Sequence, residues 1–117
     1  MSVQAIFDDL LGSRDDVLGA VVVADNGQAI TTRGINGMAA AATALVAPLR
    51  DMLERASAEL AGGRFHCTLV ESDTSKLALA DIDGLRTVVL VGSADVAPGL
   101  LRHDALSFAA ALRAGGV

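Results

Sequence analysis

The chain has 117 residues and a formal net charge of −5 at pH 7, and 52% of its residues are hydrophobic against 20% charged. This length predicts one domain over residues 1–117. The basic residues are scattered along the chain, which argues against nucleic acid as a partner. The single cysteine, Cys67, excludes an internal disulfide and a thiolate zinc site. No uncharged apolar run reaches the about 18 residues of a membrane span, and Asp8 and Asp9 stand where a signal peptide carries basic residues, so we expect a cytoplasmic protein without a membrane span.

A short amphipathic helix is expected at the start of the chain. Ser2 is a residue type that caps helix N-termini, and Gly12 is one that ends helices. Between them, apolar residues recur at helical spacing: Val3, Ile6, Phe7, Leu10 and Leu11. This stripe predicts a helix that ends at Leu11 and buries one face.

A β-hairpin is expected next. Residues 17–25 are rich in valine and bounded by turn residues, which favours a strand over a helix. The Asn26-Gly27 pair then indicates a type I′ turn, because both central residues of that turn need positive φ. Residues 28–33 should therefore return as an antiparallel strand.

A helix of about 25 residues is predicted to follow the hairpin. Asn36 is the expected N-cap, and Gly62 and Gly63 are the expected C-terminal stop. Pro48 lies inside this helix, where proline removes one backbone hydrogen bond, and predicts a kink near Ala44.

The two halves of the long helix differ in composition. The second half is amphipathic, with one apolar face formed by Leu49, Met52, Leu53, Ala56 and Leu60. The first half, residues 35–49, has no charged residue, and a sheet can cover only one of its sides. A second copy of the same helix is the simplest cover, which predicts a twofold homodimer. The alternative is that the alanines of this half serve helix propensity alone.

Three strands and a final helix complete the predicted fold. The strands are residues 65–71, 76–81 and 85–92, and the helix begins near Pro98 with a stripe of Leu101, Ala105, Phe108 and Leu112. Residues 17–24 of the first hairpin strand and residues 87–91 of the last strand are apolar at odd and even positions alike, so helices must cover both faces of the sheet. We expect an α/β fold with a five-stranded antiparallel sheet, one long helix on one face and two terminal helices on the other.

Two stretches and the order of the elements carry a family resemblance. One stretch is Leu18-Gly19-Ala20-Val21-Val22-Val23 with the turn Asp25-Asn26-Gly27, and the other is Pro98-Gly99-Leu100-Leu101-Arg102. In these features the chain resembles the roadblock/dynein-light-chain family, a relative of the longin and profilin-like folds. The resemblance implies dimers in which long helices pair and sheets join edge to edge. It also implies binding to Ras-like small GTPases, as an activator of hydrolysis or as a scaffold in signalling.

The resemblance therefore implies a non-catalytic homodimeric adaptor that regulates a small GTPase. The chain has no GxxxxGK[ST] loop and is not expected to be a GTPase itself. The dimer-interface candidates are apolar residues of the long helix and of the following edge strand: Met38, Ala41, Ala42, Leu45, Val46, Leu49, Phe65, Cys67 and Leu69. The partner-binding candidates are Arg50, Glu54 and Arg55, where either arginine could instead pair with Glu54 or Asp51 on the helix surface.

No residue set predicts catalysis, a cofactor or a metal site. His66 and Cys67 are neighbours on a strand and should point to opposite faces, while His103 and Asp104 are expected on a solvated helix face. Solvation is also the expectation for the acidic residues Asp8, Asp9, Asp15 and Asp16. The alternative function is a small-molecule-sensing α/β domain or minor enzyme, with a pocket between the sheet and a helix.

Overall fold

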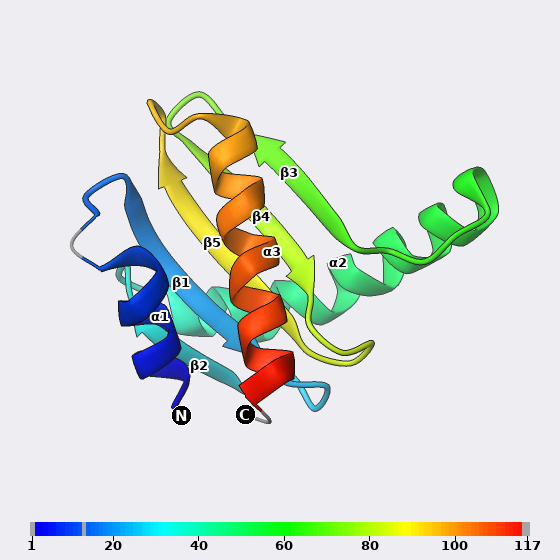
Figure 1. The fold of residues 1–117 in the computed structure, drawn as a ribbon. Coiled ribbons are helices and arrows are strands. Elements are labelled where there is room, and N and C mark those ends of the chain that lie inside the picture. The colour runs from blue at the N-terminus through cyan, green and yellow to red at the C-terminus, as the bar shows by residue number, and fades with distance from the viewer. Residues whose placement is uncertain (1, 13, 116–117) are drawn as a thin grey trace.

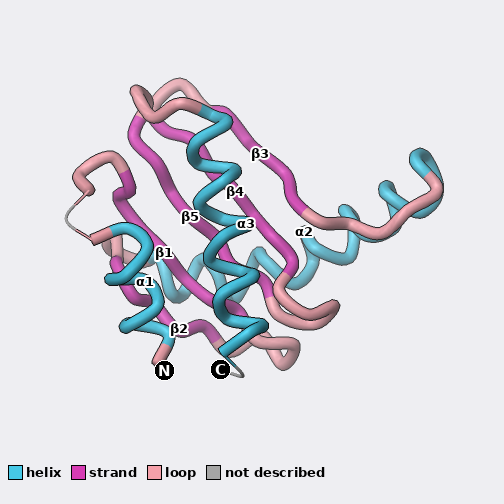
Figure 2. Tube along the Cα trace, in the orientation of Figure 1, coloured by secondary structure: helices cyan, strands magenta, loops and turns pink. Residues whose placement is uncertain are grey.

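The structure is a computed structural model that describes residues 2–12 and 14–115 (Figures 1 and 2). Its elements are α1 (Val3–Leu11), β1 (Val17–Val23), β2 (Ala29–Arg33), α2 (Met38–Ala61), β3 (Cys67–Glu71), β4 (Ser75–Asp81), β5 (Thr87–Ser93) and α3 (Pro98–Gly115). The strands form one antiparallel sheet in the order β2-β1-β5-β4-β3. Figure 1 shows α1 and α3 on one face of this sheet and α2 crossing the other. The predicted fold class is confirmed.

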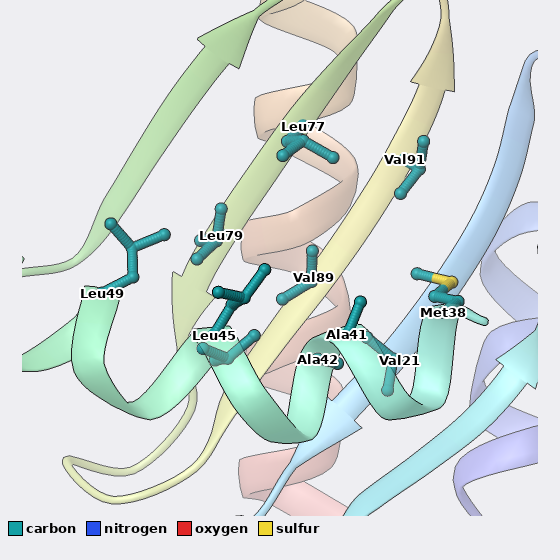
Figure 3. Close-up of a pocket in the computed structure, with 11 residues that line it drawn as sticks. Val21, Met38, Ala41, Ala42, Leu45, Leu49, Leu77, Leu79, Val89 and Val91 are labelled. Carbon is teal, nitrogen blue, oxygen red and sulfur yellow. The ribbon is translucent and has the colours of Figure 1, made fainter.

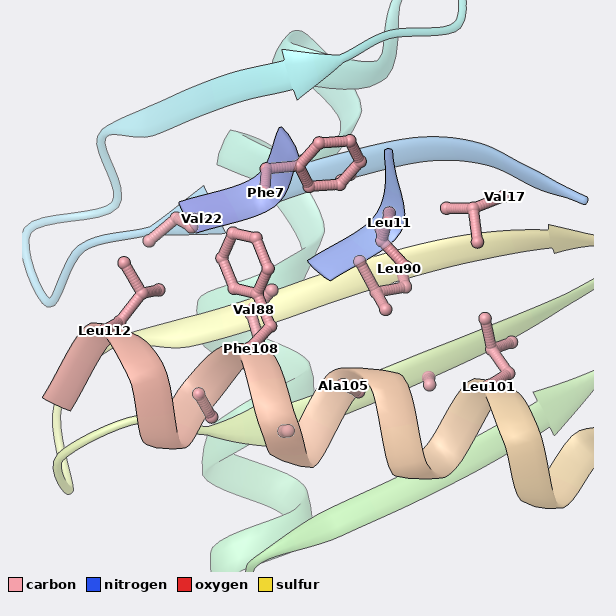
Figure 4. Packing of buried hydrophobic residues seen from close by; sticks show 14 of the residues in the cluster. Phe7, Leu11, Val17, Val22, Val88, Leu90, Leu101, Ala105, Phe108 and Leu112 are labelled. Carbon is pink, nitrogen blue, oxygen red and sulfur yellow. The ribbon is translucent and has the colours of Figure 1, made fainter. Parts of the chain in front are cut away.

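The face under α1 and α3 holds the larger hydrophobic core (Figure 4). The predicted stripe of α3 is fully buried there, with at most 1% exposure at Leu101, Ala105, Phe108 and Leu112. The rings of Phe7 and Phe108 meet edge to face with centroids 5.7 Å apart. The two terminal helices are thus packed against each other as well as against the sheet.

The first helix begins and ends where the sequence predicts. The Ser2 hydroxyl accepts a hydrogen bond from the Ala5 N–H at 3.1 Å, which makes Ser2 the N-cap. At the other end, the Gly12 N–H donates to the Asp8 carbonyl, and Gly12 has a φ of 53°. A glycine at this position carries no Cβ penalty for the positive φ.

The β1–β2 hairpin is present, but its turn differs from the predicted type. Ala24 N–H donates to the Gln28 carbonyl at 2.9 Å, and Gly27 N–H donates to the Ala24 carbonyl at 3.0 Å. Only glycines have positive φ among the described residues, so Gly27 at 85° does and Asn26 does not. The connection is a three-residue loop with a left-handed glycine, and the type I′ prediction is wrong.

The long helix runs without interruption through Pro48 over 24 residues. Asn36 does not cap it: the N-cap is Gly37, with a φ of 77° and no side-chain cap hydrogen bond. Gly62 ends the helix in a left-handed conformation, as predicted. The kink near Ala44 stays a prediction.

Candidate protein-docking surface

The first half of α2 lies over the sheet. Ala42 and Val46 are buried there against Val21 and Val23 of β1. The second half extends beyond the edge strand β3, as Figure 1 shows. We call residues 52–61 the arm. Because the sheet is wider than the helix that crosses it, part of this sheet face stays uncovered.

An open apolar groove lies between α2 and the uncovered part of the sheet (Figure 3). Its volume is about 230 Å³. The sheet contributes Val21, Leu77, Leu79, Val89 and Val91, and the helix contributes Met38, Ala41, Ala42, Leu45, Val46 and Leu49. We call this feature the α2 groove. All of the lining residues are apolar, so the groove offers contact area and no side-chain hydrogen bond.

An exposed apolar stripe continues from the α2 groove along the arm. Its members follow one another by three or four residues, which places them on one side of the helix: Leu45, Leu49, Met52, Ala56 and Leu60. The side chains of Leu45, Met52 and Leu60 are 65%, 69% and 88% exposed. Leucine and methionine side chains at such exposure along one line form an apolar patch, and large patches of this kind are characteristic of interaction sites. The stripe is therefore a candidate docking surface.

The nine predicted interface residues are divided among three places. Six of them line the α2 groove: Met38, Ala41, Ala42, Leu45, Val46 and Leu49. Phe65 is only 3% exposed and lies in the core beneath α2. Cys67 and Leu69 are half-buried against the core of the opposite face. The structure therefore brings together the helix candidates but not the candidates near β3.

β3 is an edge strand, as predicted from its position after the long helix. It pairs with β4 on one side only. Arg64 and His66 precede the strand, Glu71 ends it, and Asp73 follows; all four are exposed. The open edge thus has a basic end and an acidic end.

Arg50, a predicted partner contact, is buried at 8% exposure. Its Nη1 donates to the Arg86 carbonyl at 2.7 Å and to Thr87 Oγ1 at 2.9 Å, and its Nη2 donates to Glu54 at 3.3 Å and to Asp81. The expected helix-surface pair with Glu54 is present. The contacts with β4 and β5, however, turn the guanidinium inward, so it cannot reach a partner. We call Arg50, Glu54, Asp81 and Thr87 the Arg50 cluster.

Arg55 is the predicted partner contact that stays exposed. It lies on the arm and borders a shallow depression with Met52, Ala56, Glu59 and Leu60. Its position places a cation next to the apolar stripe. Of the three partner-binding candidates, Arg55 is the one whose charged group faces solvent.

Asp104 is buried, and its assignment to a solvated helix face is wrong. Its carboxylate accepts a hydrogen bond from Arg14 Nη1 at 2.6 Å. Arg14 also donates from Nε and Nη2 to Asp16, at 3.0 Å each, which holds the pKa of the Asp16 carboxyl below its usual value and raises the pKa of Arg14. These contacts join α3 to the α1–β1 connection.

Cys67 and His103 are residues of the described chain with reactive side-chain types, and no hydrogen bond joins them. Burial raises the pKa of the Cys67 thiol, which disfavours the nucleophilic thiolate. The exposed His103 ring lies 3.4 Å from Ser107 Oγ, but its neighbour Asp104 is engaged by Arg14. The described residues include no group of three or more metal-ligating side chains that could hold an ion.

Membrane insertion is likewise not supported by the helices. Within residues 2–12 and 14–115, no helix combines the length and the apolar character needed to cross a bilayer.

The floor of the α2 groove is the part of the site that the sequence interpretation missed. Leu77 and Leu79 alternate with small residues along β4, and Val89 and Val91 face the same side on β5. The available signal was the width of the sheet: one helix cannot cover five strands.

Comparisons with known proteins agree with this geometry. The Roadblock/LC7 domain family model matches residues 4–92. A Roadblock/LC7 domain structure from Streptomyces avermitilis aligns with a TM-score of 0.82 and 14% identity over 98% of each chain. Myxococcus xanthus MglB aligns with a TM-score of 0.83 and 16% identity over 97% of this chain and 86% of its own. Schizosaccharomyces pombe profilin reaches 0.66 with 17% identity over 99% and 100%. No curated protein sequence matches significantly.

Proposed function

The chain belongs to the Roadblock/LC7 family, and from this premise we propose that it is a non-catalytic, homodimeric cytoplasmic adaptor that binds and regulates a Ras-like small GTPase. The family resemblance implies such a partner, with the adaptor acting as an activator of GTP hydrolysis or as a scaffold. The observation that carries the proposal is the unpartnered apolar surface of α2, formed by the α2 groove and the stripe along the arm.

A second copy of the chain is the occupant that this surface fits best. Burying a leucine or methionine side chain contributes about 1.5–3 kcal/mol to the free energy of association. In a twofold dimer Leu45, Met52 and Leu60 would be buried in both copies, so each contribution would occur twice. The arm of one copy projects beyond its own sheet, where it would cover the α2 groove of the other copy. That arrangement places the large side chains of the arm against the alanine-rich half of the partner helix.

The dimensions of the α2 groove favour side chains over a small ligand. Its volume of about 230 Å³ is below the roughly 300–1,000 Å³ of typical ligand pockets. Such pockets also contain a few polar groups that orient the ligand, whereas this lining is wholly apolar. The groove therefore supports protein association rather than the sensing of a small molecule.

The open edge of β3 supports an antiparallel arrangement of the two copies. An antiparallel junction of two β3 strands would place Arg64 of one copy near Glu71 and Asp73 of the other. Opposite charges across strands are favourable, and like charges are not. The junction would also pair the free backbone groups that an edge strand leaves exposed.

Arg55 is our candidate contact for the GTPase. It is exposed on α2, near the acidic residues Asp51 and Glu59, which are also exposed. A dimer buries the apolar stripe and leaves this polar side of the helix accessible. The proposed GTPase surface is thus the outer side of α2 in the paired state.

Self-association is tested first, by sedimentation equilibrium on the purified chain at several concentrations. We expect a mass near twice the 11.9 kDa of the chain. A well-folded monomer at micromolar concentration would contradict the homodimer, and with it the main physical support of the proposal.

GTPase binding is tested by affinity capture from an extract of the source organism, loaded with a non-hydrolysable GTP analogue or with GDP. We expect a small GTPase to be retained in one nucleotide state. Its retention should be lost with Arg55→Glu and kept with Arg113→Glu, a matched exposed arginine on α3. Recovery of no small GTPase in either state would count against the proposal. Hydrolysis rates of the captured GTPase with added chain then separate an activator from a scaffold.

A further inference from the structure

We propose that Arg50 is a positioning residue that fixes the direction of the arm, and so keeps the apolar stripe in line with the α2 groove. The inference deepens the proposed function, because it concerns the same docking surface. It explains why a buried arginine stands in the middle of a helix whose neighbouring turns carry that surface.

The arm has little packing of its own to hold it. Seven of its ten residues are exposed, and Leu53 is its only apolar residue packed against the core beneath α2. Figure 1 shows the arm projecting past β3, beyond the sheet. Apolar contacts alone therefore do not determine its direction relative to the sheet.

Pro48 weakens the helix just before the arm. Proline has no N–H, so the hydrogen bond to the Ala44 carbonyl is missing, and helices bend most readily at such a position. Pro48 lies two residues before Arg50 and four before Met52. The helix thus has a flexible point between the half that lies over the sheet and the half that extends beyond it.

The Arg50 cluster supplies the missing restraint. The guanidinium donates to the Arg86 carbonyl, Thr87 Oγ1 and Asp81, which belong to β4, β5 and their connection. Asp81 is itself fixed, because it accepts the Gly84 N–H at 2.9 and 3.1 Å. A planar guanidinium with several partners fixes an angle as well as a distance.

The expected displacement is large enough to matter for docking. The arm is roughly 15 Å long at 1.5 Å per residue. A bend of about 20°, the size of an ordinary helix kink, would move its tip by roughly 5 Å. Leu60 at the tip would then leave the line of the stripe.

Hydrogen exchange of backbone amides tests the inference, with Arg50→Met compared against Arg55→Met as the matched control on the arm. We expect the amides of residues 54–61 to exchange about tenfold faster in Arg50→Met. Amides of β1 and β5 should be unchanged, and Arg55→Met should resemble the parent chain. Arg50→Lys, which keeps a cation near Asp81, should give an intermediate rate and guards against a methionine variant that does not fold.

A rescue variant separates positioning from general stability. Pro48→Ala restores the backbone hydrogen bond, so the double variant with Arg50→Met should recover much of the lost protection in the arm. Exchange that stays unchanged in the arm, or that rises equally in β1 and β5, would overturn the inference. A double variant as fast as Arg50→Met alone would overturn it too.

The same comparison distinguishes this inference from the proposed function. The hydrogen-exchange comparison can be repeated in chains that also carry Leu45→Asp, which removes the protection of amides that comes from dimer formation. The faster exchange of the arm caused by Arg50→Met should persist there. A parent chain that is monomeric would contradict the homodimer but leave this contrast measurable. A dimer in which Arg50→Met leaves amide exchange in the arm unchanged would contradict the positioning role of Arg50 but not the homodimer.

Discussion

The two faces of the sheet are both apolar, yet the chain covers them to different extents. Among the described residues, the core under α1 and α3 contains 17 buried residues, whereas the core under α2 contains seven. The first face is covered by two helices, and the second has one helix and the α2 groove. This difference leads us to propose a division of roles, in which the closed face supplies the stability of the fold and the open face serves association.

The largest expected effect lies on the closed face. Phe108→Ala should lower the free energy of unfolding by about 3–5 kcal/mol, because the ring is 1% exposed and packs on Phe7. Urea denaturation measures the loss. Leu85→Ala, at a leucine that is 61% exposed, should change the same quantity by less than about 0.5 kcal/mol. A loss under about 1 kcal/mol for Phe108→Ala would remove the assignment of stability to this face.

The open face should respond in association instead. Leu45→Asp places a charge in the apolar stripe and should raise the dissociation constant of self-association about 100-fold, or about 2.7 kcal/mol. The free energy of unfolding of the monomer should change by less than about 0.5 kcal/mol. Sedimentation velocity measures the first quantity and urea denaturation the second. Leu85→Asp, outside the stripe, is the control, and an equal loss of pairing in both variants would contradict a docking role for the stripe.

The layers of the fold could be predicted because their signals are local. Strands that are apolar at every position need cover on both faces, and the capping residues of α1 mark its two ends. The turn after β1 was harder, because Asn26-Gly27 suits both a type I′ turn and a three-residue loop with a left-handed glycine. The choice depends on where the strands stop pairing, and a sequence does not show that.

The candidate site was predicted only in part, because its decisive contacts join distant segments. The sequence suggests that Arg50 pairs with Glu54 one turn away, but the buried contact with Asp81 spans 31 residues. Asp104 looks like an ordinary surface residue until Arg14, 90 residues earlier, is placed beside it. The helix candidates of the interface could be found because an uncharged helix half is a local feature. The groove floor depends on the sheet order, which is a property of the whole fold.

A smaller effect on the free energy of unfolding is expected in the loop between β1 and β2. Gly27 has a φ of 85°, a conformation that costs other residues about 1–2 kcal/mol. Gly27→Ala should therefore lower the free energy of unfolding by about 1 kcal/mol, measured by urea denaturation. An added Cβ would meet no atom within 4 Å at Gly27 or at Gly63, and Gly63 lacks a positive φ. Gly63→Ala is therefore a control that adds a Cβ without the cost of a positive φ. Equal losses of unfolding free energy in both variants would contradict the assignment of the loss at Gly27 to its φ.

The smallest effect concerns acid and the contacts that join α3 to the α1–β1 connection. Hydrogen bonds from Arg14 hold the pKa of Asp16 below its ordinary value. A carboxyl with a lowered folded-state pKa contributes stability above its unfolded-state pKa, and that contribution is lost as the pH falls through the folded-state value. The free energy of unfolding should therefore decrease as the solution is acidified below the ordinary aspartate range of about pH 4. Denaturation at a series of pH values should show a shallower decrease in Asp16→Asn than in Asp15→Asn, whose carboxylate is exposed in the same connection.

Salt sharpens this last test. The Asp16 side chain is 37% exposed, so solvent screens its ion pair with Arg14. The expected change in the free energy of unfolding is therefore smaller than in the predictions above. Raising the ionic strength should reduce the difference between the two variants further, whereas the loss in Phe108→Ala should remain. An acid sensitivity that is unchanged by Asp16→Asn would contradict a contribution of the Arg14–Asp16 pair to stability. The α1–β1 connection is also held by Arg33, which donates to the carbonyls of Gly12, Arg14 and Val17 at 2.8 to 3.0 Å. Arg33→Met would then lower the free energy of unfolding at every pH, because backbone carbonyls do not titrate.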